Sequence, residues 1–104
     1  MPMVIAQDNV RVLQDLRDGR LRLVAPLFVT LEEEEGVVVA SNVDLDVFGY
    51  GDTEAEALQD LRDIIVETYF DLKANRDQLA SHLQAIWMYL DRVVLEMELQ
   101  PLAA

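Results

Sequence analysis

The chain contains no cysteine and a single histidine, His82. Without cysteine it can form neither a disulfide nor a thiolate metal site, a composition that fits a cytoplasmic protein. No serine stands in a nucleophile-elbow context, and Gly49-Tyr50-Gly51 lacks the spacing of a dinucleotide-binding fingerprint. His82 has no recognisable orienting partner in the sequence, so a surface position is expected for it. These absences predict a protein that is not an enzyme, with no catalytic residues, no metal and no cofactor.

Long apolar runs are also missing. No run approaches the roughly 20 residues that a membrane helix needs. Residues 1–6 have neither the basic n-region nor the long apolar core of a signal peptide. We therefore expect a cytoplasmic protein without a membrane segment. Hydrophobic residues make up 52% of the chain, and 104 residues suffice for one core, so residues 1–104 are predicted to form a single domain.

Basic residues are scarce: eight stand against 20 acidic ones, for a formal charge of −12 at pH 7. Four of the eight lie in residues 1–22, together with three aspartates. The rest of the chain holds four basic and 17 acidic groups, a net charge of −13. Such a surface repels phosphate backbones, so direct nucleic-acid binding is not expected, and it attracts a basic protein partner. The alternative is that the charge serves solubility alone.

The first quarter of the chain permits two interpretations. Residues 1–9 are expected to be poorly ordered or to form an edge segment. Val10–Leu16 reads either as one strand of a hairpin that turns at Asp18-Gly19 into Leu21–Val24, or as a short helix, because its apolar residues also fit helical spacing. The turn dipeptide favours the hairpin.

Three further strands are predicted. Pro26 marks the start or edge of the first, in which Leu27, Val29 and Leu31 share one face opposite Phe28, Thr30 and Glu32. The glutamates of residues 32–35 form a charged turn with Gly36. Val37–Ala40 is a β-branched strand, which Ser41-Asn42 connects to an extended run over Leu45–Tyr50. In that run Leu45, Val47 and Gly49 lie opposite Asp44, Asp46, Phe48 and Tyr50. Short connections imply antiparallel pairing.

The main helix is predicted at about residues 53–73. Thr53 and Glu56 have the spacing of a capping box, and Gly49 and Gly51 supply backbone freedom for the preceding turn. The apolar stripe follows three- and four-residue steps. It consists of Leu58, Leu61, Ile65, Thr68 and Leu72, widened by Ala57, Ile64 and Tyr69.

A second, C-terminal helix is predicted at about residues 79–94, with Asn75 or Ser81 as its cap. Its stripe consists of Leu79, Leu83, Ile86, Trp87, Leu90, Val93 and Val94. Trp87 is expected in the core, while Met88 and Tyr89 face elsewhere, either in a subunit interface or as scattered exposed residues. Val93–Leu99 also alternates and fits either helix or a closing strand, and Pro101 ends both.

Asp44 and Asp46 form the one acidic pair whose spacing suggests chemistry. Two residues apart on a strand, their carboxylates would share a face. Such pairs hold divalent metals in two-metal nucleases, provided that further carboxylates, such as Asp52 or Glu67, come close. Two aspartates on a solvated sheet face are the commoner arrangement. A metal-dependent nuclease is therefore the less favoured alternative function.

Several segments together resemble the HicB-like antitoxin superfamily. They are Glu35–Ala40, Val43–Leu45 and the Gly-Asp-Thr-x-x-Glu-Ala-Leu opening at Gly51–Leu58, within a resemblance over about residues 27–73. The resemblance implies a truncated ribonuclease-H-like fold with a β-β-β-α core. It also implies an antitoxin-type role, in which a small, basic, RNA-cleaving HicA-like toxin is bound and silenced, and assembly into dimers or higher oligomers.

Two departures from the family pattern are visible. Asp46-Val47-Phe48 replaces the usual Pro-Gly-Cys-like stretch, and residues 75–100 form an acidic segment instead of a DNA-binding module. We therefore expect an orphan member with an α+β fold, in which a small antiparallel sheet is packed by the main helix. The expected function is non-enzymatic binding of a small basic protein through an acidic surface. The alternative is a homo-oligomeric structural or regulatory domain.

Overall fold

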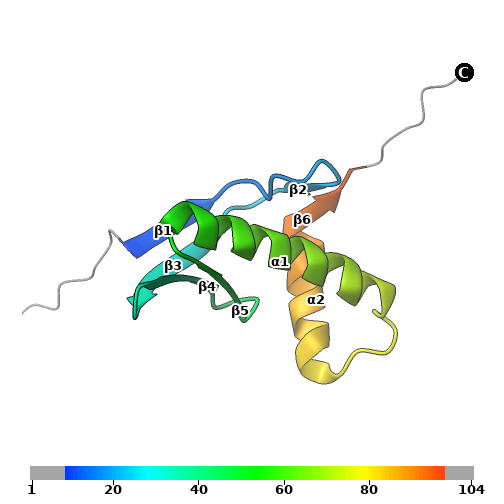
Figure 1. Cartoon of the computed structure of the whole chain (residues 1–104). Coiled ribbons are helices and arrows are strands. Elements are labelled where there is room, and N and C mark those ends of the chain that lie inside the picture. Colours follow the sequence, from blue (N-terminus) through cyan, green and yellow to red (C-terminus); the bar gives the residue numbers. More distant parts are fainter. Residues whose placement is uncertain (1–8, 98–104) are drawn as a thin grey trace, which may run out of the picture.

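The computed structural model describes residues 9–97, in which strands and helices form an α+β fold, as predicted (Figure 1). The elements in chain order are β1 (Val10–Leu13), β2 (Leu21–Leu23), β3 (Leu27–Glu34), β4 (Val37–Asn42), β5 (Val47–Gly51), α1 (Glu54–Ala74), α2 (Ser81–Val93) and β6 (Val94–Glu96).

Four strands form an antiparallel sheet in the order β1-β3-β4-β5. The succession β3, β4, β5, α1 is the predicted β-β-β-α order. The turn between β3 and β4 is shorter than predicted, because β3 continues to Glu34 and only Glu35 and Gly36 turn, with φ of 52° and 81°. Two successive residues with positive φ match the twist of a tight hairpin, so the neighbouring glutamates stay in the strand.

The predicted hairpin between Val10–Leu16 and Leu21–Val24 is wrong. β1 pairs with β3, where Val10 lies opposite Thr30, whereas β2 pairs with the distant β6. The helical alternative is wrong as well, because Val10–Leu13 is a strand. Buried Leu13 at the end of β1 and buried Leu16 after it anchor this part of the chain in the core, and this separates β1 from β2. Residues 1–8, included in the predicted N-terminal segment, lie outside the described residues.

Helix α1 lies across one face of the sheet (Figure 1). Its capping box forms as predicted: the Glu56 N–H donates to Thr53 Oγ1, and Glu56 Oε1 accepts from the Thr53 N–H. The buried stripe follows the predicted spacing, although Leu58, Ile64 and Thr68 are only half-buried and Val66 is buried without having been predicted. Its buried members are Ala57, Leu61, Ile65, Val66, Tyr69 and Leu72.

Helix α2 starts at Ser81 and has Ala80 as its N-cap residue, without a side-chain cap bond. Both predicted caps are therefore wrong, and Asn75 instead lies at the C-cap of α1. Trp87 is half-buried, with its ring 5.3 Å from that of Tyr69. The backbone becomes extended at Val94, where β6 begins and pairs with β2. Of the two alternatives for Val93–Leu99, the strand is therefore the one formed from Val94 to Glu96. Residues 98–104, with Leu99 and Pro101, are outside the described part.

Candidate functional site

Asp44 and Asp46 do not share a strand face, so that prediction is wrong. They lie in the turn between β4 and β5, and Asp46 has a positive φ of 54°. The turn is fixed by Asn42, whose Oδ1 accepts from the Leu45 N–H at 2.8 Å, while Leu45 itself is buried. Within residues 9–97 no group of three or more histidine, aspartate or glutamate side chains is placed to hold a metal. The arrangement that a two-metal nuclease needs is not formed there.

Asp44 instead lies beside Tyr89 of α2. Burial raises the pKa of the half-buried Tyr89 hydroxyl, and the charge of Asp44 and hydrogen bonding to it raise the pKa further. This contact connects α2 to the β4–β5 turn, so the Tyr89 side chain contributes to packing within the fold. Met88, its neighbour, is 60% exposed, and His82 is exposed as predicted.

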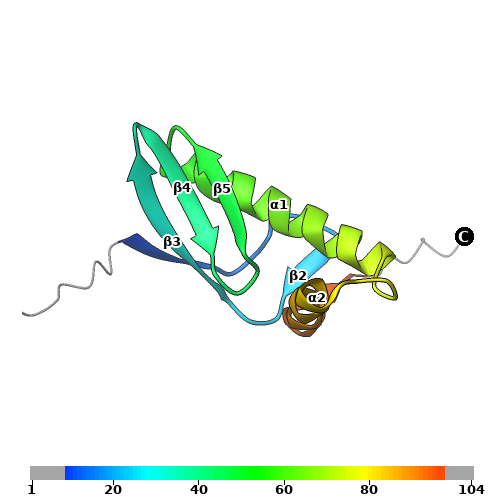
Figure 2. The ribbon, with the colours of Figure 1, turned by 90° about the horizontal axis from the view of Figure 1, so that it is seen from below.

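The more informative surface is the sheet face opposite α1. Alternation along each strand and the pairing register assign its residues. We call these residues the open face: Val10, Val12, Phe28, Thr30, Glu32, Glu34, Val37, Val39, Ser41, Phe48 and Tyr50. None of these side chains is buried, and Phe28, Phe48 and Tyr50 are 60%, 46% and 56% exposed. Seen from below, β3, β4 and β5 present this face with α1 behind them and no helix across it (Figure 2).

Charge is unevenly distributed over the open face. Phe28 pairs with Val12, and Phe48 pairs with Ser41, so one end is uncharged. At the other end Glu32 pairs with Val39 and Glu34 pairs with Val37, next to the Glu35-Gly36 turn. The open face as defined carries two carboxylates and neither lysine nor arginine. Its chemistry is an aromatic and aliphatic surface with an acidic border.

Side chains bond the backbone at both edges of the sheet. At β5 the backbone N–H of Tyr50 donates to Asp60 Oδ2 of α1 at 2.8 Å, so a side chain occupies this edge. At the opposite edge, Arg11 of β1 donates from Nε and Nη2 to the carboxylate of Glu54 at 2.7 and 3.0 Å. Hydrogen bonding from Arg11 lowers the pKa of Glu54. Both outermost strands, β1 and β5, therefore have one backbone group bonded by a side chain, because Arg11 Nη1 also donates to the Val10 carbonyl at 3.0 Å.

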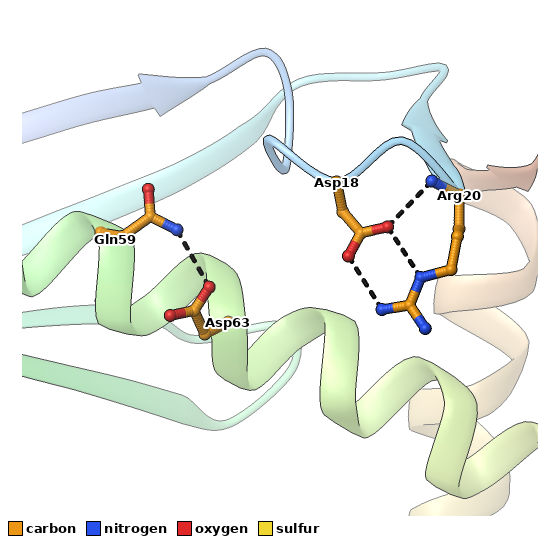
Figure 3. A network of polar contacts seen from close by, with 4 residues as sticks. All are labelled: Asp18, Arg20, Gln59 and Asp63. Carbon is orange, nitrogen blue, oxygen red and sulfur yellow. Dashed lines mark hydrogen bonds and ion pairs between the residues drawn. The ribbon is translucent and has the colours of Figure 1, made fainter.

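A polar cluster outside the open face serves the fold (Figure 3). Arg20 donates from its backbone N–H and Nε to Asp18 Oδ1 and from Nη2 to Asp18 Oδ2, at 2.8 to 3.0 Å. These bonds lower the pKa of Asp18 to about 2. The Arg20 guanidinium also stacks 4.5 Å from the ring centre of Phe70. The cluster therefore holds the loop before β2 against α1.

A second polar group joins α1 to β6. Lys73 bonds Glu96, which raises the pKa of Lys73 and lowers that of Glu96, and the Tyr69 hydroxyl lies 3.4 Å from Glu96 Oε1. Burial is the first cause of the raised pKa of Tyr69. These groups are engaged with one another across the packed elements. They form a structural tie and offer no unsatisfied acid or base.

Comparison with models of protein families, with curated proteins and with solved structures finds no match to this chain. Neither α1 nor α2, the helices of the described range, is both long enough and apolar enough to cross a membrane.

Sequence reasoning placed Phe28, Phe48 and Tyr50 opposite the buried side of their strands, and the structure confirms this. It missed that these residues converge on one uncovered surface. The available signal was the presence of aromatic residues at outward positions, where a solvated strand usually carries polar ones. Their convergence depends on the strand register, which the sequence pattern alone leaves undetermined.

Proposed function

We propose that this chain is a non-enzymatic, cytoplasmic protein-interaction domain that binds a small basic protein through the open face. The observation that carries the proposal is the exposure of Phe28, Phe48 and Tyr50 on a sheet face that no described helix covers. Contiguous exposed apolar surface on a folded domain typically marks an interaction site. A layer of secondary structure from a partner would bury it.

Charge favours a basic partner. The open face has two carboxylates and no basic residue, and the whole chain has a formal charge of −12. Opposite charge at the rim of an interface accelerates encounter and disfavours acidic partners, including nucleic acids. The resemblance to HicB-like antitoxins and the β-β-β-α order support an antitoxin-like role, in which the partner is a HicA-like RNA-cleaving toxin.

The test compares three forms of the full chain as affinity baits in the native cell: the unaltered protein, Phe28→Ser and Met88→Ser. Phe28 and Met88 are both 60% exposed, but only Phe28 belongs to the open face. We expect a small basic protein to be retained by the unaltered chain and by Met88→Ser, and to be lost with Phe28→Ser. Its binding is then measured with purified proteins. Equal retention by Phe28→Ser would refute the proposed surface.

A second candidate role is that of a homo-oligomeric domain, favoured by the position of β1 at an edge of the sheet. Two copies would pair their β1 strands antiparallel. Because the chain has no cysteine, Val10→Cys and Val12→Cys variants report such pairing by disulfide formation without background. Val43→Cys, at a residue 85% exposed in the β4–β5 turn, is the control. A monomer by light scattering and no β1 crosslink would exclude this assembly.

A further inference from the structure

We infer that the occupant of the open face is a basic amphipathic helix of the partner, lying along the strands with its lysines and arginines beside Glu32 and Glu34. This inference rests on the proposed function and adds the form and direction of the bound segment. Its apolar side would cover Phe28 and Phe48 at the other end. The bound state would have helices on both faces of the sheet.

A helix fits this surface better than a strand does. A strand adds at a sheet edge, and the β5 edge is occupied by the bond between the Tyr50 N–H and Asp60. Strand addition at β1 would also leave the open face uncovered. On the opposite face of the sheet, α1 already packs on β5 and β4 as a covering helix. Along β3 the distance from Phe28 to Glu34 is about 20 Å, at about 3.4 Å per residue, so a helix of about four turns, about 22 Å long, is sufficient.

A second copy of this chain is a poor occupant. Its own open face would bring two more glutamates and no basic residue to the contact. Its longest helix would bring an acidic outer side, formed by Glu54, Asp63, Glu67 and Asp71, which are all exposed. Like charges across an interface oppose binding. A basic helix supplies the missing counter-charge.

The register of the strands also indicates where the central contact with the helix would lie. Thr30 and Ser41 lie directly opposite each other at the centre of the open face. Larger side chains surround them. Ser41 pairs on its other side with Phe48, and Tyr50 is two residues after Phe48 on the same strand. Phe28 lies two residues before Thr30, on the same face of β3. A large apolar residue of the helix would fit above the two small ones. Central residues of this kind carry most of the energy in protein interfaces.

The probe is a designed peptide of about 18 residues, about 27 Å as a helix. It carries leucines on one stripe, lysines in its last two turns and a fluorophore for anisotropy. One control peptide has glutamates in place of the lysines, and another has the same composition with the stripe scrambled. Amide chemical-shift mapping on the full chain locates the binding site.

We expect the lysine peptide to bind, with shifts on β3, β4 and β5, and both control peptides to bind at least about tenfold more weakly. Phe28→Ser should weaken binding about tenfold, whereas Met88→Ser should leave it unchanged. Ser41→Tyr should also weaken binding although it adds aromatic surface, because the tyrosine would fill the space above Thr30 and Ser41. Non-specific hydrophobic binding would instead become tighter. Glu32→Lys should reduce affinity for the lysine peptide and increase it for the glutamate peptide.

Absence of binding by the lysine peptide, shifts confined to α2 or to β2 and β6, or tighter binding by Ser41→Tyr would each overturn the inference. The proposed function is tested separately by the captured basic protein. If the captured protein no longer binds Phe28→Ser, but the lysine peptide does not bind the unaltered chain, the open face is the binding surface and the helical form of the bound segment is wrong. If Phe28→Ser affects neither ligand, both proposals fail.

Discussion

Gly49 of β5 lies against the backbone of Leu61 in α1, so closely that a Cβ at residue 49 would be 2.4 Å from the Leu61 nitrogen. A Cβ at Gly51 would meet Glu56 at 2.5 Å. Neither glycine has a positive φ; that conformation occurs at Gly36 among the described glycines. The prediction that these glycines give a turn its freedom is therefore wrong. They allow the helix to pack directly on the last strand.

Replacement of Gly49 by alanine should destabilise the fold by at least about 2 kcal/mol, because the clash is with backbone that no side-chain rotation relieves. Thermal or urea unfolding measures the change. Gly19→Ala is the matched control, since no atom lies within 4 Å of a Cβ at that position, and it should change stability by less than about 0.5 kcal/mol. Equal stability of the two variants would contradict the packing described.

Asn42 is the one buried polar residue in the core of the described range, and it joins two segments. Its Nδ2 donates to the Phe28 carbonyl at 2.9 Å, and its Oδ1 accepts from the Leu45 N–H. Asn42→Ala leaves both backbone groups without their partner, so we expect a loss of about 3 kcal/mol in the free energy of unfolding. Asn75→Ala removes an exposed bond to the Asp71 carbonyl and should cost about 1 kcal/mol or less. Comparable losses would argue against this role for Asn42.

The Asp18–Arg20 contact should make stability depend on acid pH. The folded-state pKa of Asp18 is lowered to about 2 from 3.8, so its ionic contribution is complete above pH 3.8 and is lost as pH falls toward 2. Asp18→Asn keeps an oxygen acceptor but removes the charge. The difference in unfolding free energy between the two proteins should therefore shrink between pH 4 and pH 2. A difference that is constant over this range would show that the charge of Asp18 contributes nothing to stability. Asp77→Asn, at an exposed residue, is the control, and its difference from the unaltered protein should not change in the same way between pH 4 and pH 2.

Asp60→Ala should increase self-association. The substitution removes the acceptor of the Tyr50 N–H and leaves the β5 edge able to pair with another strand. Light scattering over a concentration series should show a higher mean mass than for the unaltered chain. Asp63→Ala, which removes a carboxylate bonded only within α1 to Gln59, is the charge-matched control. If both variants have the same mass, Asp60 does not protect the edge.

Local features could be predicted from the sequence because the residues that form them are close together along the chain. The capping box joins Thr53 to Glu56, and the Glu35-Gly36 turn joins adjacent strands, so each depends on a few neighbouring residues. The pairing of β2 with β6 joins Leu23 to Val94, and no local pattern identifies such a partner. Asp44 and Asp46 were misplaced for a similar reason, because the side chain of Asn42 converts an apparently extended run into a turn.

By itself, the sequence determined the acidic charge, the start of the main helix and the inward and outward sides of β3 and β5, because composition and period need no tertiary partner. Only the tertiary structure decided that Phe28, Phe48 and Tyr50 gather on one face and that no described helix covers it. It also decided that Gly49 serves close packing on Leu61. Strand register and helix placement are set by the burial of residues far apart in the chain, and those contacts exist only once the chain has folded.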